Sequence, residues 1–280
     1  MMYPIIILGS GYTGRYLAGS LATTSCPFFA TSREPDKNLS PVPADRRMRF
    51  DLEQPSTWRN IPTSADLIWC FPAAPLDQVQ AFAHTFDAPA RRIVVLGSTS
   101  AYEVSDRSDE YPPLWTDESA PLDLSKPRVQ GEEFLRKDYG AILLRVAGIY
   151  GPGRNPLDWI RTGRVSPTGK YVNLIHVEDL ASICLLALDK GKRGEAYNVS
   201  DGQPHTWNEI CATAQQRWGV TPTAANKDSS PGKRISNAKL RSELGCTLRH
   251  PGLYEALALI ESSNGVEAQD GQSGFQQGPR

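Results

Sequence analysis

Short apolar runs alternate with helix-like segments along the first half of the chain. Six runs are rich in Ile, Val, Leu and Phe and lack clean polar alternation, which is typical of strands in a parallel sheet that is buried on both faces. We expect these strands over residues 3–8, 28–32, 47–52, 67–71, 92–97 and 141–146. Between them the pattern predicts helices over 13–24, 76–85 and 127–139. Such a series of strand–helix–strand units predicts an α/β fold, a doubly wound parallel sheet of the Rossmann type.

The pattern changes after Tyr150, where a loop rich in Gly, Pro and Arg leads into short strands and further helices. We expect residues 1–150 to form a dinucleotide-binding core and residues 151–261 a smaller C-terminal substrate lobe interleaved with that core. From Ser262 onward Gly, Gln, Ser and Asn predominate, and this composition buries too little apolar surface to order a segment. Residues 262–280 are therefore predicted to be a disordered tail.

Composition and charge exclude several classes of protein. A chain of 280 residues with 40% apolar residues and a formal charge of −1 has no basic excess for nucleic acid or an anionic membrane. No apolar run is long enough to span a bilayer, and the chain enters a strand without the pattern of a signal peptide. Five cysteines and four histidines are scattered without disulfide or metal-site spacing. We expect a cytoplasmic protein that acts on a small molecule without a metal.

A glycine motif lies between the first predicted strand and the first predicted helix. Gly9, Gly11 and Gly14 form G-x-G-x-x-G. The first glycine allows a tight turn, the second lets backbone approach a pyrophosphate, and the third lets the helix pack on the strand. The free N–H groups of the helix then point at the phosphates. The motif predicts a dinucleotide site, with FAD and S-adenosylmethionine as weaker alternatives that use a similar loop.

The end of the second predicted strand favours NADP over NAD. An NAD-selective site places an acidic residue there to bind the ribose 2′-hydroxyl, whereas this chain has Thr31-Ser32-Arg33. A guanidinium can form paired hydrogen bonds with a 2′-phosphate, although a solvated surface arginine is the alternative. Asp51 is expected to lie beside the adenine. The predicted contacts to the dinucleotide are Gly9, Ser10, Gly11, Tyr12, Thr13, Gly14, Ser32, Arg33, Asp51, Leu52, Pro72 and Ala73.

Four segments of the second half carry a family resemblance. They are LLRVAGIYGPGRNP (143–156), VNLIHVEDLASICLLAL (172–188), GEAYNVSDGQPHTWNEI (194–210) and GKRISNAKLRSELG (232–245). Together they resemble the extended short-chain dehydrogenase/reductase superfamily, which includes the nucleotide-sugar epimerases and dehydratases. The spacing of the glycine motif is similar to that of the atypical branch of this family. The resemblance implies a Rossmann fold, a nicotinamide cofactor, a nucleotide-sugar type of substrate and pairing into dimers.

The resemblance also implies a proton relay that this chain lacks. Members that transfer a hydride use a tyrosine, a lysine four residues later and an upstream Ser or Thr, and the tyrosine exchanges a proton with the substrate hydroxyl. Ser98 matches the Ser/Thr position. The tyrosine position is Leu124 or Leu122, depending on the register, and Arg128 takes the lysine position in the first register. Because leucine has no ionisable proton, the usual relay cannot run here.

Two residues are candidates for parts of an altered relay. Tyr111 lies in the Pro-rich insertion 101–123 and is a candidate catalytic residue that would reach the site as a lid. Arg128 cannot act as a base at neutral pH, but it is expected to bind the cofactor ribose or a substrate anion.

Two arginines are predicted to bind the substrate. Arg154 and Arg161 lie in the segment that receives the substrate diphosphate in the resembling family, and a guanidinium matches phosphate or carboxylate oxygens. Two functions stay open. The first is an NADP(H)-dependent oxidoreductase or epimerase with an altered proton relay, and the second is a non-catalytic NADP(H)-binding or redox-sensing protein.

Overall fold

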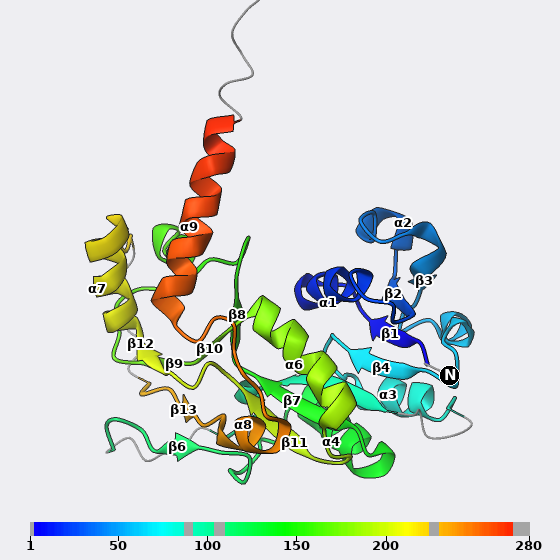
Figure 1. Ribbon diagram of the computed structural model, residues 1–280. Coiled ribbons are helices and arrows are strands. Elements are labelled where there is room, and N and C mark those ends of the chain that lie inside the picture. The colour runs from blue at the N-terminus through cyan, green and yellow to red at the C-terminus, as the bar shows by residue number, and fades with distance from the viewer. Residues whose placement is uncertain (1–2, 87–91, 104–109, 224–229, 271–280) are drawn as a thin grey trace, which may run out of the picture.

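A seven-stranded parallel sheet forms the centre of the computed structural model, which describes residues 3–86, 92–103, 110–223 and 230–270 (Figure 1). Its strands are β1 (Ile5–Leu8), β2 (Phe28–Ser32), β3 (Arg47–Arg49), β4 (Asp66–Trp69), β5 (Ile93–Ser98), β7 (Ile142–Val146) and β11 (Ala196–Val199). Their order is β3-β2-β1-β4-β5-β7-β11, and every neighbouring pair is parallel. The predicted doubly wound parallel sheet is therefore confirmed.

Helices cover both faces of this sheet. On one face lie α1 (Tyr12–Ala22) and α6 (Val177–Lys190), and on the other lie α3 (Leu76–Ala83) and α4 (Pro127–Tyr139) (Figure 1). Successive side chains of β1 alternate between the two layers. Ile5 and Ile7 join the cluster under α1 and α6, whereas Ile6 and Leu8 join the cluster under α3 and α4. Because both faces are covered, the strand is apolar at every position, as its sequence indicated.

Residues after β7, together with one short strand that precedes β7, build a lobe at the carboxyl edge of the sheet, and the residues after β7 also return to the sheet itself. Strand β11 and helix α6 belong to the sheet layers, although both follow Tyr150. The boundaries of the predicted domains remain a prediction. The lobe contains three small strand pairs, which are β8 (Gly148–Tyr150) with β10 (Leu174–His176), β9 (Tyr171–Val172) with β12 (His205–Thr206), and β6 (Trp115–Thr116) with β13 (Arg234–Ile235).

Short and lobe helices complete the described chain. Helix α7 begins with a capping box, in which the Thr206 hydroxyl and the Glu209 carboxylate each accept the other residue's backbone N–H. A separate apolar cluster, which includes Leu157, Ile210 and Leu257, joins α5, α7 and α9. The remaining bounds are α2 (Pro35–Asn38), α5 (Pro156–Arg161), α7 (Trp207–Trp218), α8 (Ala238–Leu244), α9 (Leu253–Asp270) and the 3₁₀ turns Ala44–Arg46, Pro55–Asn60 and Thr99–Ala101.

Helix α9 differs from the sequence prediction. It continues through Ser262 to Asp270, within the segment that was expected to be disordered. Leu253, Leu257 and Ile260 pack this helix into the lobe core. Once a helix is nucleated by such packing, each further residue adds a hydrogen bond, so the helix extends beyond its last packed residue. Residues 271–280 of the predicted tail lie outside the described residues, and none of the described helices is long and apolar enough to cross a membrane.

Gly131 allows α4 to approach the loop after β4. A Cβ at Gly131 would lie 1.9 Å from the carbonyl oxygen of Ala73. We expect Gly131→Ala to lower the free energy of unfolding by about 1–3 kcal/mol, because the helix must shift away from this backbone atom. Gly19→Ala on α1 is the control, since nothing lies within 4 Å of the added Cβ, and the higher helix propensity of alanine should raise stability by about 0.5–1 kcal/mol. Urea denaturation measures both, and equal responses would contradict the close approach.

Candidate functional site

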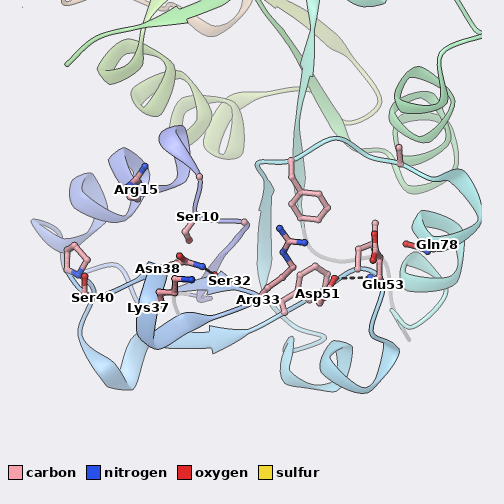
Figure 2. Close-up of a pocket in the computed structure, with 17 residues that line it drawn as sticks. Ser10, Arg15, Ser32, Arg33, Lys37, Asn38, Ser40, Asp51, Glu53 and Gln78 are labelled. Atoms are coloured by element: carbon pink, nitrogen blue, oxygen red, sulfur yellow. Dashed lines mark hydrogen bonds between the residues drawn. The ribbon is translucent and has the colours of Figure 1, made fainter. Parts of the chain in front are cut away.

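A cavity of about 680 Å³ opens at the carboxyl ends of β1, β2 and β4 (Figure 2). The chain runs from β1 outward to β2 and β3 on one side, whereas β4 and β5 lie on the other side of β1. In doubly wound sheets this reversal separates the loops that follow adjacent strands and leaves a crevice for a ligand. The cavity therefore lies where the topology predicts a binding site.

The glycine motif shapes one wall of this cavity. Gly9 has a φ of 85°, a left-handed conformation that favours glycine, and its N–H donates to the Thr31 hydroxyl over 2.9 Å. A Cβ on Gly14 would lie 2.4 Å from the Gly9 carbonyl oxygen, so α1 packs directly on the turn. Nothing lies within 4 Å of a Cβ placed on Gly11. Gly9 and Gly14 thus fix the conformation of the turn and the packing of α1 on it. Gly11 has no side chain, so its backbone is accessible from the cavity.

The first turn of α1 is suited to bind an anion. Gly11 is the N-cap, and no side chain caps the turn or places an acidic group in it. The N–H groups at such a helix start have no partner within the helix and carry a partial positive charge. They therefore provide the donors that a phosphate group accepts from.

Cationic side chains line the cavity on α1 and at and after the end of β2. Arg15, Arg33 and Lys37 line the cavity together with the carboxylates of Asp51 and Glu53 (Figure 2). Glu34, the acidic residue that follows Arg33, is not part of the lining. This balance of charge favours an anionic group at the β2 end of the cavity.

Ser32 is positioned by hydrogen bonds. Its hydroxyl oxygen accepts from the backbone N–H of Glu34 (3.2 Å) and from the Asn38 side-chain amide (3.0 Å). Because both contacts use the oxygen as acceptor, the hydroxyl proton can be donated to a ligand in the cavity. Asp51 also has a partner, since its carboxylate accepts from the backbone N–H of Glu53 (3.1 Å).

The structure places the predicted cofactor residues in two groups. Gly9, Ser10, Gly11, Ser32, Arg33, Asp51 and Leu52 line the cavity. The second group is not among the lining residues, and consists of Tyr12, Thr13, Gly14, Pro72, Ala73 and Arg128. Sequence reasoning missed several lining residues, which include Arg15, Lys37, Asn38, Ser40, Phe50, Phe71 and Gln78. For Lys37 and Asn38, the one feature of the sequence that could have predicted a place in the cavity lining is their proximity to Arg33.

The two segments in which the sequence predicts the proton relay lie side by side. The backbone N–H of Asp123 donates to the Ala101 carbonyl (2.8 Å), and the Lys126 ammonium donates to the Ser100 carbonyl (2.7 Å). Ser98 ends β5, and its hydroxyl oxygen accepts from the Ser100 N–H (3.1 Å). Leu124, one of the two candidates for the tyrosine position, is 55% exposed, and the other, Leu122, bridges to Tyr102. Both candidates are leucines beside the segment that follows Ser98, and the assignment of a relay to these residues stays a prediction.

Tyr111 contacts the lobe. Its side chain is 61% exposed, its hydroxyl donates to the Gly169 carbonyl (3.0 Å), and its ring lies 5.7 Å from that of Tyr171. A tyrosine held at the surface in this way must leave Gly169 before it could act on a substrate. Its catalytic role stays a prediction.

Buried ion pairs support the helix that follows this location. Two guanidinium nitrogens of Arg128 donate to one carboxylate oxygen of Glu132, at 3.0 and 2.8 Å. Burial raises the pKa of Glu132, which the Arg128 charge partly counteracts. The Tyr102 hydroxyl donates to Asn198 (2.6 Å) and accepts from Arg145 (3.0 Å). Arg128 is therefore paired with Glu132, its predicted role toward the cofactor stays a prediction, and the Tyr102 hydroxyl is held by Asn198 and Arg145.

The two predicted substrate arginines also have partners. Arg161 forms ion pairs with Asp158 (2.7 Å) and Glu261 (2.5 Å), and the Glu261 hydrogen bond raises its pKa. The guanidinium of Arg154 lies 5.3 Å from the ring centre of Tyr12. The Tyr12 hydroxyl in turn donates to the Pro152 carbonyl (2.9 Å). The start of α1 is thus tied to the loop after β8, and the charge of Arg161 is already balanced.

A cluster of His176, Glu178 and His250 is a feature that the sequence did not indicate. Candidate ligand atoms of these residues lie within 4.8 Å of one another. The ring centres of the two histidines are 3.8 Å apart, and the Nδ1 atom of His176 accepts the Glu178 N–H over 3.3 Å. Because Nδ1 accepts this hydrogen bond, a neutral His176 carries its proton on Nε2. The two stacked histidine rings also do not direct their lone pairs at one metal ion. The cluster fits a tie between α6 and the C-terminal segment better than a metal site.

Comparison with known proteins gives relatives for the fold. No protein-family model matches the chain. Protein YeeZ of Escherichia coli is 32% identical over 112 residues, and this match spans 39% of the chain and only 40% of the length of YeeZ. A candidate NAD-dependent epimerase/dehydratase from Methylobacillus flagellatus has a TM-score of 0.75 and 24% identity, over 94% of this chain and 99% of that one.

Two further structures cover nearly the whole chain at lower identity. A short-chain dehydrogenase/reductase superfamily protein from Agrobacterium tumefaciens, solved with NAD, has a TM-score of 0.77 and 14% identity, over 97% of this chain and 100% of that one. The UDP-glucose 4-epimerase of Thermotoga maritima, solved with UDP-glucose, has a TM-score of 0.68 and 15% identity, over 93% and 99%. The chain has the fold of these proteins. This similarity confirms the structural resemblance that the sequence motifs indicated.

His176 predicts a loss of stability in mild acid. The side chain is 3% exposed, and burial, with a smaller effect of His250, lowers its pKa to about 4. Because an unfolded histidine has a pKa of about 6.5, the unfolded chain takes up the proton first as the pH falls. The stability present above about pH 6.5 should decrease by on the order of 2–3 kcal/mol as the pH approaches about 4.

Urea denaturation between these pH values measures the effect. His176→Asn keeps an acceptor at the start of α6 and should flatten the pH dependence relative to the unchanged protein. The exposed His84 provides the matched control, since His84→Asn should leave the slope unchanged. A slope that is the same for all three proteins would show that His176 does not titrate in this window.

Proposed function

We propose that this protein binds NADP(H) in the cavity at the carboxyl ends of β1, β2 and β4. The observation that carries the proposal is the combination of an open glycine turn with the Ser32 hydroxyl and the Arg33 guanidinium at the β2 end of the cavity, where Lys37 also lies although it pairs with Glu34 at 3.4 Å. A pyrophosphate at the glycine turn would meet the free N–H groups of α1. The adenosine then extends toward β2, where a 2′-phosphate finds cations instead of the carboxylate that an NAD-selective site presents.

We further propose that the bound dinucleotide serves a redox reaction of the epimerase/dehydratase type, on a nucleotide-activated or other anionic small molecule. Support comes from Ser98, which keeps its position at the end of β5, and from neighbours of the same fold that were solved with NAD or UDP-glucose. The nicotinamide would accept or return a hydride. Because Leu124 cannot exchange a proton, this function needs a relay in which Ser98 works with another group or with water.

A non-catalytic NADP(H)-binding or redox-sensing protein is the second candidate. Leucine at both candidate tyrosine positions, Leu122 and Leu124, favours it. Turnover of NADP(H) with a panel of nucleotide sugars separates the two functions. NADPH binding combined with no oxidation or reduction of any panel member would favour the sensor, whereas turnover with one member would establish catalysis. Dimer formation is a separate prediction, which light scattering tests.

Arg33→Ala should weaken NADP(H) binding selectively. Loss of a charge-assisted hydrogen bond to the 2′-phosphate costs about 1.5–3 kcal/mol, which is roughly ten- to a hundredfold in affinity. NAD(H) has no such phosphate, so its affinity should change little. Calorimetric titration of both cofactors measures the difference, and Arg59→Ala, outside the cavity lining, is the control. Equal losses for NADP(H) and NAD(H) would show that Arg33 does not bind the 2′-phosphate.

Gly11→Val should abolish dinucleotide binding in a folded protein. Gly11 has a φ of −68° and open space around its Cβ position, so a valine fits the free protein. Its branched side chain would fill the space in which the pyrophosphate meets backbone. We expect stability to change by no more than about 1 kcal/mol. Gly19→Val, on the exposed part of the same helix, should leave NADPH affinity unchanged, and retained affinity in Gly11→Val would exclude the glycine turn from the site.

A further inference from the structure

Arg154 lies beside the glycine turn, although it belongs to the lobe. Its guanidinium is 5.3 Å from the ring centre of Tyr12, the first residue of α1. Gly11 and Arg15, which lie on either side of Tyr12 in the sequence, both line the cavity. The Arg154 side chain is therefore close to the end of the cavity at which the glycine turn would receive a pyrophosphate.

Contacts on both sides of Arg154 hold its loop against α1. The Tyr12 hydroxyl donates to the carbonyl of Pro152, two residues before Arg154, over 2.9 Å. The next residue, Asn155, is buried, and its side-chain amide donates to the Glu261 carboxylate over 2.6 Å. The position of Arg154 next to Tyr12 is thus fixed by its neighbours in the loop.

The charge of Arg154 is not balanced by the part of the protein that the structure describes. Among these residues, no carboxylate oxygen lies within 4.0 Å of its guanidinium, and no hydrogen bond uses its side-chain nitrogens. In contrast, Arg161 of the same lobe is paired with Asp158 and Glu261. A guanidinium held over an aromatic ring keeps its N–H groups available in its own plane, where they match the oxygens of a phosphate.

We propose that Arg154 binds the pyrophosphate of the dinucleotide, and that it belongs to the cofactor site rather than to the substrate site that the sequence suggested. Both phosphates of a pyrophosphate are ionised at neutral pH, whereas the start of α1 offers N–H groups with only a partial charge. Arg154 supplies a full positive charge from the side of the lobe. The bound cofactor then joins α1 to the loop after β8. This assignment rests on the proposed dinucleotide function.

Calorimetric titration of the full chain with NADPH and with NADH, in the absence of a substrate, tests the assignment. Arg154→Met removes the guanidinium and keeps an unbranched side chain that can pack on Tyr12. We expect the affinity for both cofactors to fall by roughly tenfold or more, as for the loss of a charge-assisted hydrogen bond. Arg33→Ala should weaken NADPH alone, because NADH has no 2′-phosphate. Unchanged affinity for both cofactors in the folded Arg154 variant would overturn the assignment.

Arg161→Met is the matched control, since this arginine is in the same lobe and already has carboxylate partners. It should leave both affinities unchanged. An equal loss in Arg161→Met and Arg154→Met would assign the effect to the lobe as a whole and would overturn the specific role of Arg154. Thermal melts show whether each variant is folded, and Arg154→Gln, which is also uncharged, serves if Arg154→Met does not fold.

The double variant of Arg33→Ala and Arg154→Met identifies which phosphate each arginine binds. If they bind different phosphates, their separate losses of NADPH affinity multiply. A combined loss no larger than the greater single loss would place both on one group and overturn the pyrophosphate assignment. Binding of neither NADPH nor NADH by the unchanged protein would overturn the proposed function and this assignment together, whereas normal binding by a folded Arg154 variant overturns this assignment alone.

Discussion

The close packing of α1 on the turn after β1 is the constraint on which the rest of the structure depends. The Gly9 carbonyl occupies the space of a side chain at Gly14, and the left-handed φ of Gly9 turns the chain directly from strand to helix. This contact aims the start of α1 at the crevice beside β4. Strand β1 itself is held between β2 and β4 and buried on both faces, so the turn has a rigid base. An uncapped helix start can then be kept open for an anion.

Charged side chains in this protein form two groups: some are paired within the protein, and others line the cavity, where cations are in excess. In the layer behind the relay location they are paired, since Glu132 bonds Arg128 and Glu133 bonds both Arg136 and Arg145. Removing one member of such a buried pair would leave a charge without a partner, which makes these residues structural. Among the residues that line the cavity, the cations Arg15, Arg33 and Lys37 outnumber the carboxylates Asp51 and Glu53. This positive excess is the charge that an anionic cofactor would meet in the proposed function.

Leucines at both candidate tyrosine positions, Leu122 and Leu124, would affect more than one side chain of the expected proton relay. A tyrosine there would need a nearby cation to lower its pKa, and the lysine position is occupied by Arg128, which is bonded to Glu132. In the register that assigns Leu124 and Arg128 to the relay, both members therefore differ from the expected pair, and this assignment stays a prediction. Lys126 lies between them in the sequence, but its ammonium contacts the Ser100 carbonyl and Asp123. The residues around Ser98 thus supply cations and a hydroxyl, but no tyrosine in the usual place.

The sequence by itself determined the sheet, the glycine motif and much of the helix pattern. Continuous apolar runs predicted the strands, and the bounds of β2 and α4 agree with the predicted segments 28–32 and 127–139. These features depend on residues within a few positions of one another, where periodicity and turn chemistry act. Only the tertiary structure decided which charges are balanced. Glu261 neutralises Arg161 from 100 residues away, and His250 stacks on His176. Lys233 reaches the turn after β5 because β13 returns to it. Such contacts depend on the path of the whole chain, and a local pattern carries no information about which distant side chain will arrive.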